Sequence, residues 1–192
     1  MSDFISGLRV AVATMAICVA GYAALILGFA QVLTPATANG SLVTNEHGKI
    51  LGSRLIAQRF ASQAYFWPRP SAVDYNAAGA GGSNLSPANQ ALTKRAKGLI
   101  AAYGGATERQ PIPADLVTAS GSGLDPNISL EGALVQVPRV AKARGVETSA
   151  VASVVQHLAY APGAFFSDNR IVNVLELNLA LDAELAAPAA RD

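Results

Sequence analysis

VAVATMAICVAGYAALILGFAQVL, residues Val10 to Leu33, is the stretch that decides how this chain is organised. It holds no charged side chain and a single amide, Gln31. As an α-helix it is about 36 Å long, which is enough to cross a hydrocarbon core of about 30 Å. We therefore predict a transmembrane helix over 10–33, after a short tail over 1–9 and before a linker over 34–40.

A cleaved signal peptide is the alternative interpretation, with Arg9 as its basic region and Ala36 to Ala38 as its cleavage site. The apolar core of a signal peptide runs for about 7–15 residues, and this stretch is longer, so a retained anchor is favoured. Residues 148–167 also lack charge, but Pro162 and several polar residues make them a poor lipid-facing helix. A single span is expected.

Basic residues near the span indicate its orientation. Arg9 lies directly before the span, whereas Lys49 lies well beyond its end. The positive-inside rule therefore favours an N-terminus in the cytoplasm and a main body outside it. Cys18, the only cysteine, falls inside the span, so the sequence excludes an intramolecular disulfide.

The composition excludes two classes of protein. The 192 residues carry 14 Lys and Arg against 13 Asp and Glu. This balance lacks the basic excess that phosphate contacts require, so nucleic acid is not expected as a partner. Hydrophobic residues make up 51% of the chain and charged residues 14%, which excludes an intrinsically disordered protein.

Residues 41–192 are predicted to form one compact soluble α+β domain, because Gly and Pro divide them into short elements without a repeat. The expected elements are an extended piece and short helix over 48–60, a loop over 67–86, helices over 87–102, 125–145 and 148–160, and a strand over 171–175 that enters a last helix. The last helix carries the apolar stripe Leu177, Leu181 and Leu185.

Capping residues locate the ends of two of these helices. Ser86 is the expected N-cap of the helix over 87–102, and Asp125 that of the helix over 125–145. Gly145 is placed to end the second helix, and Pro138 inside it predicts a break or a kink.

Sequence motifs for catalysis are absent. The chain contains no GxxxxGK[ST], GxSxG or GxGxxG pattern. His47 and His157 are far apart in sequence with no cysteine near them, so no metal site is expected. His157 is predicted to be a partly buried polar residue on a helix. No nucleophile and base pair supports an enzyme.

The most unusual polar segment is TASGSGLD, Thr118 to Asp125. Alternating Ser and Gly before a capped helix can turn backbone N–H groups toward an anion such as a phosphate. The alternative is an ordinary turn, which the chemistry of Ser and Gly favours. AGGSNL, residues 80–85, is likewise predicted to be a turn.

Arg139, Lys142 and Arg144 form a small basic group. A solvated helix face is the favoured interpretation. Docking of an acidic partner or a nucleotide phosphate is the alternative.

Small residues recur every four positions inside the span, at Ala16, Ala20, Ala24 and Gly28. Such a ladder allows two helices to approach closely in lipid, so we predict that a partner helix packs there. The alternative is that this spacing of small residues is a coincidence, because the whole chain is rich in alanine.

Five longer strings resemble the C subunit of the bacterial Kdp potassium-transporting P-type ATPase, in that family's order. They are YFWPRPSAVDYN (65–76), GGSNLSPAN (81–89), DLVTASGSGLDPNIS (115–129), QVPRVAKARG (136–145) and VNVLELNLALD (172–182). With the N-terminal anchor, the resemblance covers nearly the whole chain. Pro68, Ala80 and Asn127 depart from the family's usual Gly, Ser and His.

The resemblance implies a single-pass subunit of the bacterial inner membrane, with its N-terminus in the cytoplasm and its soluble domain in the periplasm. The implied partners are a channel-like potassium-binding subunit, a P-type subunit that hydrolyses ATP, and membrane lipid. The chain lacks the Asp-Lys-Thr-Gly phosphorylation motif, so it is expected to be non-catalytic. It is expected to hold no tightly bound cofactor and to meet ATP only through the complex.

The family is described as a catalytic chaperone that raises the ATP affinity of the pump subunit. Gln136 matches the glutamine proposed to assist nucleotide binding. With the Ser-Gly segment and the basic group, the candidates for nucleotide contact are Ser120, Gly121, Ser122, Gly123, Gln136 and Arg139.

Topology decides between two mechanisms. A body outside the cytoplasm cannot touch cytoplasmic ATP, so its effect on the pump must pass through the span as coupling between states. The expected role is then to stabilise the complex and to cap the outer potassium entrance. Direct nucleotide contact is the alternative, and an anchored extracytoplasmic binding module unrelated to ion transport is a second.

Overall fold

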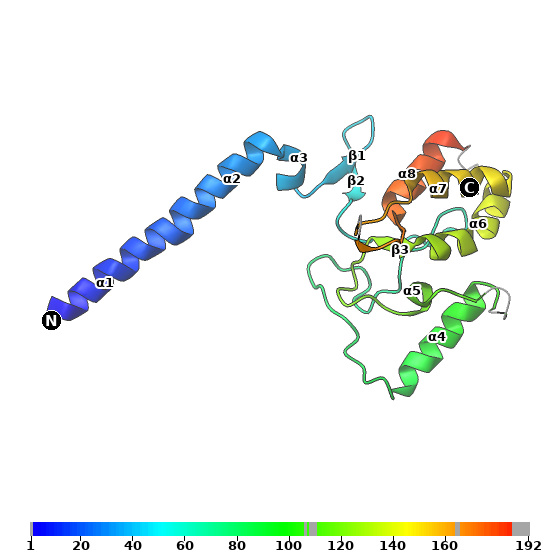
Figure 1. Ribbon diagram of the computed structural model, residues 1–192, viewed down its shortest axis with the longest axis horizontal. Helices are drawn as coiled ribbons and strands as arrows, with labels where there is room; N and C mark the ends of the chain where they lie inside the picture. The colour runs from blue at the N-terminus through cyan, green and yellow to red at the C-terminus, as the bar shows by residue number, and fades with distance from the viewer. Residues whose placement is uncertain (1, 106, 108–110, 164–165, 186–192) are drawn as a thin grey trace. The chain divides into compact units, whose positions relative to one another are not determined.

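The computed structural model describes residues 2–105, 107, 111–163 and 166–185 (Figure 1), and the chain divides into two compact units, with the boundary between Leu51 and Gly52. Together they contain one long N-terminal helix and a mixed region of helices and short strands. This confirms the predicted fold class, α+β behind a helix able to span a membrane.

The first unit is dominated by a continuous apolar helix over Ser2–Leu33, long enough to cross a bilayer. It comprises α1 (Ser2–Met15), a π-helical segment η1 (Ala16–Gly21) and α2 (Tyr22–Leu33), and none of its residues is buried within the chain. The residues predicted as a tail are therefore helical from Ser2 onward. In the predicted linker, α3 (Pro35–Ala38) forms one short helical turn.

The small-residue ladder crosses the π-helical segment. Ala16 and Ala20 lie in η1, and Ala24 and Gly28 follow in α2. All four are exposed. Packing of a partner helix on this ladder stays a prediction.

A hairpin follows the helices, made of β1 (Leu42–Thr44) and β2 (Ile50–Ser53), which pair in a two-stranded sheet. Its turn is organised by Asn45, whose side-chain Oδ1 accepts hydrogen bonds from the backbone N–H groups of His47 and Lys49. His47 is exposed in this turn.

The core of the second unit forms where three helices meet a second small sheet. The helices are α6 (Leu130–Arg144), α7 (Thr148–Leu158) and α8 (Val174–Glu184). The sheet pairs β3 (Asn127–Ser129) with β4 (Ile171–Asn173) in antiparallel register, with Ile128 opposite Val172. Fully buried residues from each element fill the centre, among them Ile128, Val140, Val155, Val172, Leu177 and Leu181.

Two features of α6 differ from the prediction. The helix begins at Leu130 with Ser129 as its N-cap, not at Asp125, because residues 127–129 pair with β4 instead of coiling. It also continues through Pro138 without a break. Val137 and Val140 beside Pro138 are buried in the core, so packing outweighs the hydrogen bond that proline cannot donate. The predicted end at Gly145 is confirmed, since Gly145 has φ +68°.

Three other elements differ from the prediction. No helix forms after β2, where the backbone N–H of Ala57 instead donates to Leu124 O. The next helix, α4 (Gln90–Ala102), starts late because Asn89 caps it, while Ser86 closes a separate turn. The strand β4 ends at Asn173, whose side chain caps α8 by accepting from Glu176 N.

Other predictions are confirmed. Residues 67–86 contain no helix or strand. The helix α7 lies within the predicted range 148–160, and it buries Val151, Val154 and Val155. A single-turn helix, α5 (Ala114–Val117), was not predicted and buries Leu116.

Candidate functional site

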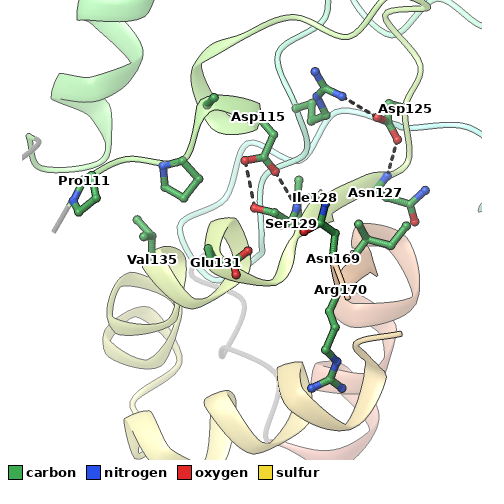
Figure 2. Close-up of a pocket in the computed structure, with 14 residues that line it drawn as sticks. Pro111, Asp115, Asp125, Asn127, Ile128, Ser129, Glu131, Val135, Asn169 and Arg170 are labelled. Carbon is green, nitrogen blue, oxygen red and sulfur yellow. Dashed lines mark hydrogen bonds and ion pairs between the residues drawn. The ribbon is translucent and has the colours of Figure 1, made fainter. Parts of the chain in front are cut away.

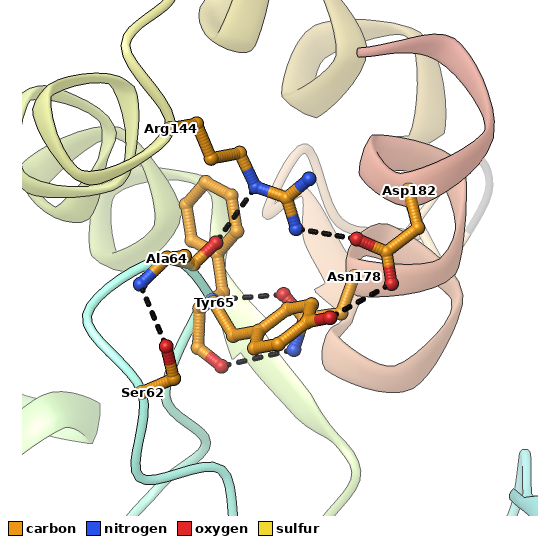
Figure 3. Close-up of polar contacts among 7 residues, drawn as sticks. Ser62, Ala64, Tyr65, Arg144, Asn178 and Asp182 are labelled. Atoms are coloured by element: carbon orange, nitrogen blue, oxygen red, sulfur yellow. Dashed lines mark hydrogen bonds and ion pairs between the residues drawn. The ribbon is translucent and has the colours of Figure 1, made fainter. Parts of the chain in front are cut away.

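The segment Gln63 to Trp67 has no secondary structure of its own, yet each of its backbone carbonyls accepts a hydrogen bond from a side chain of α6 or α8. The donors are Gln136, Arg139, Arg144 and Asn178, and we call this arrangement the clasp. It ties an irregular segment to two helices that are far away in sequence. Figure 3 shows its Arg144 and Asn178 side.

Two buried amides in the clasp imitate the pairing of a neighbouring strand. The side chain of Asn178 accepts from Phe66 N at 2.8 Å and donates to Phe66 O at 3.1 Å. Gln136 repeats this on the next residue, accepting from Trp67 N at 2.8 Å and donating to Trp67 O at 3.1 Å. Buried backbone groups need partners, and these amides supply them in place of a sheet.

Arg139 joins the clasp through both charge and stacking. Its Nη1 donates to Gln63 O at 2.7 Å and to Tyr65 O at 3.0 Å, and its Nη2 donates to Gln136 Oε1 at 2.7 Å. The guanidinium carbon lies 3.8 Å from the centre of the Trp67 ring. Burial lowers the pKa of Arg139 to about 10, which leaves it cationic at neutral pH.

Tyr103 packs against Trp67 with the two ring planes tilted by 54° and the ring centres 5.7 Å apart. Burial raises the pKa of Tyr103 to about 12. The order Arg139, Trp67, Tyr103 therefore places a cation and two aromatic rings in contact, an arrangement that stabilises the cation without a carboxylate.

Arg144 is the most deeply buried cation of the clasp, with a side chain that is 0% exposed. Its Nε donates to Ala64 O at 2.8 Å, and its Nη2 pairs with Asp182 Oδ1 at 2.7 Å. The Tyr65 hydroxyl donates to the other oxygen of Asp182 at 3.0 Å. The pKa of the Tyr65 hydroxyl is raised, first by burial and then by this carboxylate (Figure 3).

These contacts correct the predicted solvated basic face. Only Lys142 is exposed, whereas Arg139 is half-buried and Arg144 is buried. Both arginines point toward carbonyls of the clasped segment, because these carbonyls lack a strand partner. The spacing of the three cations in the sequence could not reveal this.

The Ser-Gly segment, residues 118–125, is not part of the clasp and lies against the loop over 70–82. Ser120 is buried and its N–H donates to Pro70 O at 3.3 Å, while Ser122 O accepts from Gly81 N at 2.7 Å. Gly123 has φ +68°, and a Cβ there would lie 2.6 Å from Val73 Cγ2. Gly121 and Ser122 are exposed. The segment is therefore built as a turn packed on a second loop.

The six candidates for nucleotide contact thus fall into two groups. Gln136 and Arg139 are in direct contact with each other, but within the described residues no hydrogen bond or ion pair joins them to Ser120, Gly121, Ser122 or Gly123. The clasp itself was missed by sequence reasoning, because its partners are 69 to 112 residues apart.

A pocket of about 810 Å³ lies beside β3 and holds several carboxylates (Figure 2). Asp115 Oδ2 accepts from Ser129 N at 2.6 Å, and Asp125 Oδ1 accepts from Asn127 N at 3.0 Å. Asp125 also pairs with Arg69 at 2.9 Å. These two carboxylates cap the N–H groups on the free edge of β3, which protects that edge from further pairing. Asp115 and Asp125 therefore have a structural role and do not form an acid and base pair.

In the described part of the chain, no group of three or more His, Cys, Asp or Glu side chains is placed so that it could hold a metal ion. His157 is exposed near the end of α7, not partly buried as predicted, because Val154 and Val155 take the core-facing positions of that helix.

In the described residues, fold and site together define a protein with one helix able to span a membrane and an α+β body in which polar side chains of α6 and α8 hold an irregular segment in place. The chain matches the family model described as KdpC, K⁺-transporting ATPase c chain, over residues 4–183. The chain belongs to this family.

Curated relatives agree with the family model. The chain is 54% identical over 182 residues to the potassium-transporting ATPase KdpC subunit of Parvibaculum lavamentivorans, covering 95% of this chain and 97% of that protein. It is 49% identical over 170 residues to the KdpC subunit of Geobacter sulfurreducens, covering 86% and 89%. It is therefore a subunit of a potassium-transporting ATPase complex with an accessory role in potassium uptake. An anchored module unrelated to ion transport is excluded.

Proposed function

We propose that this chain is a non-catalytic subunit that stabilises the assembly of a potassium-binding, channel-like subunit with a P-type subunit that hydrolyses ATP. Its second unit lies outside the cytoplasm, in the periplasm, and covers the outer entrance for potassium. It raises the ATP affinity of the pump subunit indirectly, as a catalytic chaperone acting through the membrane helix. The chain itself holds no tightly bound cofactor and meets ATP only through the complex.

The main support for this proposal is that Gln136 is buried and already hydrogen-bonded. Gln136 is 0% exposed, and its amide already makes hydrogen bonds to Trp67, Arg139 and Gly132. To reach a nucleotide, this side chain would have to leave buried backbone groups without partners, at about 1–3 kcal/mol for each group. The geometry therefore supports a structural role for the glutamine that resembles the family's nucleotide-assisting residue.

The Ser-Gly segment offers the alternative of direct nucleotide contact. Gly121 and Ser122 are exposed, which favours this second candidate. However, the N–H groups of Ser120, Gly123 and Leu124 already donate within the protein, to Pro70 O, Ser120 O and Ser122 Oγ. Three of the N–H groups that a phosphate cradle needs are thus committed elsewhere.

Photolabelling of the intact complex with azido-ATP tests the proposal. We expect label on the ATP-hydrolysing subunit and only background label on this chain. Label on this chain that excess ATP removes would overturn the indirect mechanism. Peptide mapping of such label to residues 118–125 would establish the direct alternative.

A further inference from the structure

The helix α4 lies at the edge of the second unit and is poorly covered by it (Figure 1). None of its 13 residues is buried, and its main contact is with the single turn of α5. Leu92, Ala96 and Leu99 are half-buried, while Lys94 and Lys97 are exposed. A helix of this length in a folded domain usually buries an apolar face, so α4 leaves a surface available for another partner.

Among the described residues, the cations of α4 also have no carboxylate partner. Elsewhere in the second unit, four arginines pair with carboxylates: Arg54 with Glu176, Arg59 with Asp74, Arg69 with Asp125 and Arg144 with Asp182. Within the described residues, none of Lys94, Arg95 and Lys97 has such a partner. The sequence from 76 to 107 contains no Asp or Glu at all. The helix therefore carries a local positive charge in a nearly neutral chain.

A small pocket adjoins these cations between α4 and α5. Its volume is about 260 Å³, and its polar lining consists of Thr93, Arg95 and Thr118. The Nε of Arg95 is buried without a hydrogen-bond partner. In the part of the chain that the structure describes, the two threonine side chains also lack a hydrogen bond. A phosphate group, with oxygens that accept from a guanidinium and from hydroxyls, matches this donor set.

We propose that α4 and this pocket bind the phosphate headgroup of an anionic phospholipid. A basic amphipathic helix is typical of segments that lie on membrane surfaces. Lipid is favoured over an acidic protein surface because the same chain carries the apolar helix Ser2–Leu33, which brings a bilayer within reach. The contact would hold the second unit near the membrane independently of other subunits.

Amide hydrogen exchange of the full chain in lipid nanodiscs tests this proposal. Exchange of residues 90–102 is compared between discs of phosphatidylcholine alone and discs that also contain phosphatidylglycerol. We expect slower exchange only in the anionic discs. In Lys94→Glu/Lys97→Glu this protection should fall roughly 25-fold, about five-fold for each cation that leaves an anionic surface. Arg95→Gln should reduce it as well.

Lys142→Glu is the matched control, since Lys142 is an exposed cation on α6 of the same unit. It should keep the protection of α4. Equal exchange in both kinds of disc would overturn the proposal. Protection in neutral discs on adding inorganic phosphate would show a free-anion site instead. Protection that appears only with the partner subunits, whatever the lipid, would identify an acidic protein surface as the occupant.

Discussion

The side-chain amide of Gln136 pairs with the backbone of Trp67 through two hydrogen bonds, of 2.8 and 3.1 Å, across 69 residues of sequence. This pairing converts an irregular segment into a fixed part of the core, because both backbone groups of Trp67 gain a buried partner. Trp67 is also the only tryptophan of the chain, so its fluorescence reports directly on the clasp.

Replacing Gln136 by Leu should destabilise the second unit by about 2–3 kcal/mol, since the backbone of Trp67 loses both of its partners and Arg139 loses one of its acceptors, while the volume stays similar. Urea unfolding of the full chain in detergent, followed by Trp67 fluorescence, measures this. Gln156→Leu, at an exposed position of α7, should change stability by no more than about 0.5 kcal/mol. A Gln136→Leu chain of unchanged stability whose complex loses ATP affinity would argue against a structural role.

Arg144→Lys should cost about 2–3 kcal/mol, because an ammonium cannot reach both Ala64 O and Asp182 in the geometry of the buried guanidinium. The same exchange at Arg54 is a suitable comparison. Arg54 pairs with Glu176 while 61% exposed, so Arg54→Lys should cost at most about 0.5 kcal/mol. Similar losses at the two positions in the same urea titration would contradict the description of the clasp.

Gly123→Ala should destabilise by about 2 kcal/mol or more, since Gly123 has φ +68° and a Cβ would meet Gly81 O at 2.9 Å. Gly121→Ala should be nearly neutral, because nothing lies within 4 Å of its Cβ. If the segment is only a packed turn, the KM for ATP of the complex should be unchanged in Gly121→Ala. A raised KM with normal stability would support direct nucleotide contact.

Alkaline pH should weaken the second unit through Tyr103. Its pKa is about 10 in the unfolded chain and about 12 in the folded one, so from pH 10 upward the unfolded state loses this proton first. Stability should therefore fall as pH rises, by about 2–3 kcal/mol near pH 12. Tyr103→Phe should lose less over the same range. The difference between the two proteins isolates Tyr103, since both contain Arg139; parallel curves would contradict its burial.

Patterns carried by neighbouring residues were predictable from the sequence. The apolar run that ends at Leu33 predicts the spanning helix, and Gly145 predicts the end of α6, because each signal is complete within a few residues. The helix start predicted at Asp125 was wrong for the opposite reason. Asp followed by Pro is a sound helix start locally, but here residues 127–129 pair with β4, a partner more than 40 residues away.

The clasp could not be predicted either, because its partners are also far apart in the sequence. From the sequence alone, nothing shows that the amide of Gln136 is paired with the backbone of Trp67. Arg139 and Arg144 were predicted to lie on a solvated face, because the sequence does not show that the carbonyls of residues 63–65 lie against them. The roles of these residues depend on a segment without secondary structure, and no sequence periodicity predicts where such a segment lies.

The location of the second unit tests the central claim most directly, because a body outside the cytoplasm cannot bind cytoplasmic ATP. Alkaline phosphatase and green fluorescent protein are each fused after Asp192, in cells that make the whole complex. The indirect mechanism predicts an active phosphatase and a dark fluorescent protein. An inactive phosphatase together with cytoplasmic fluorescence would contradict it.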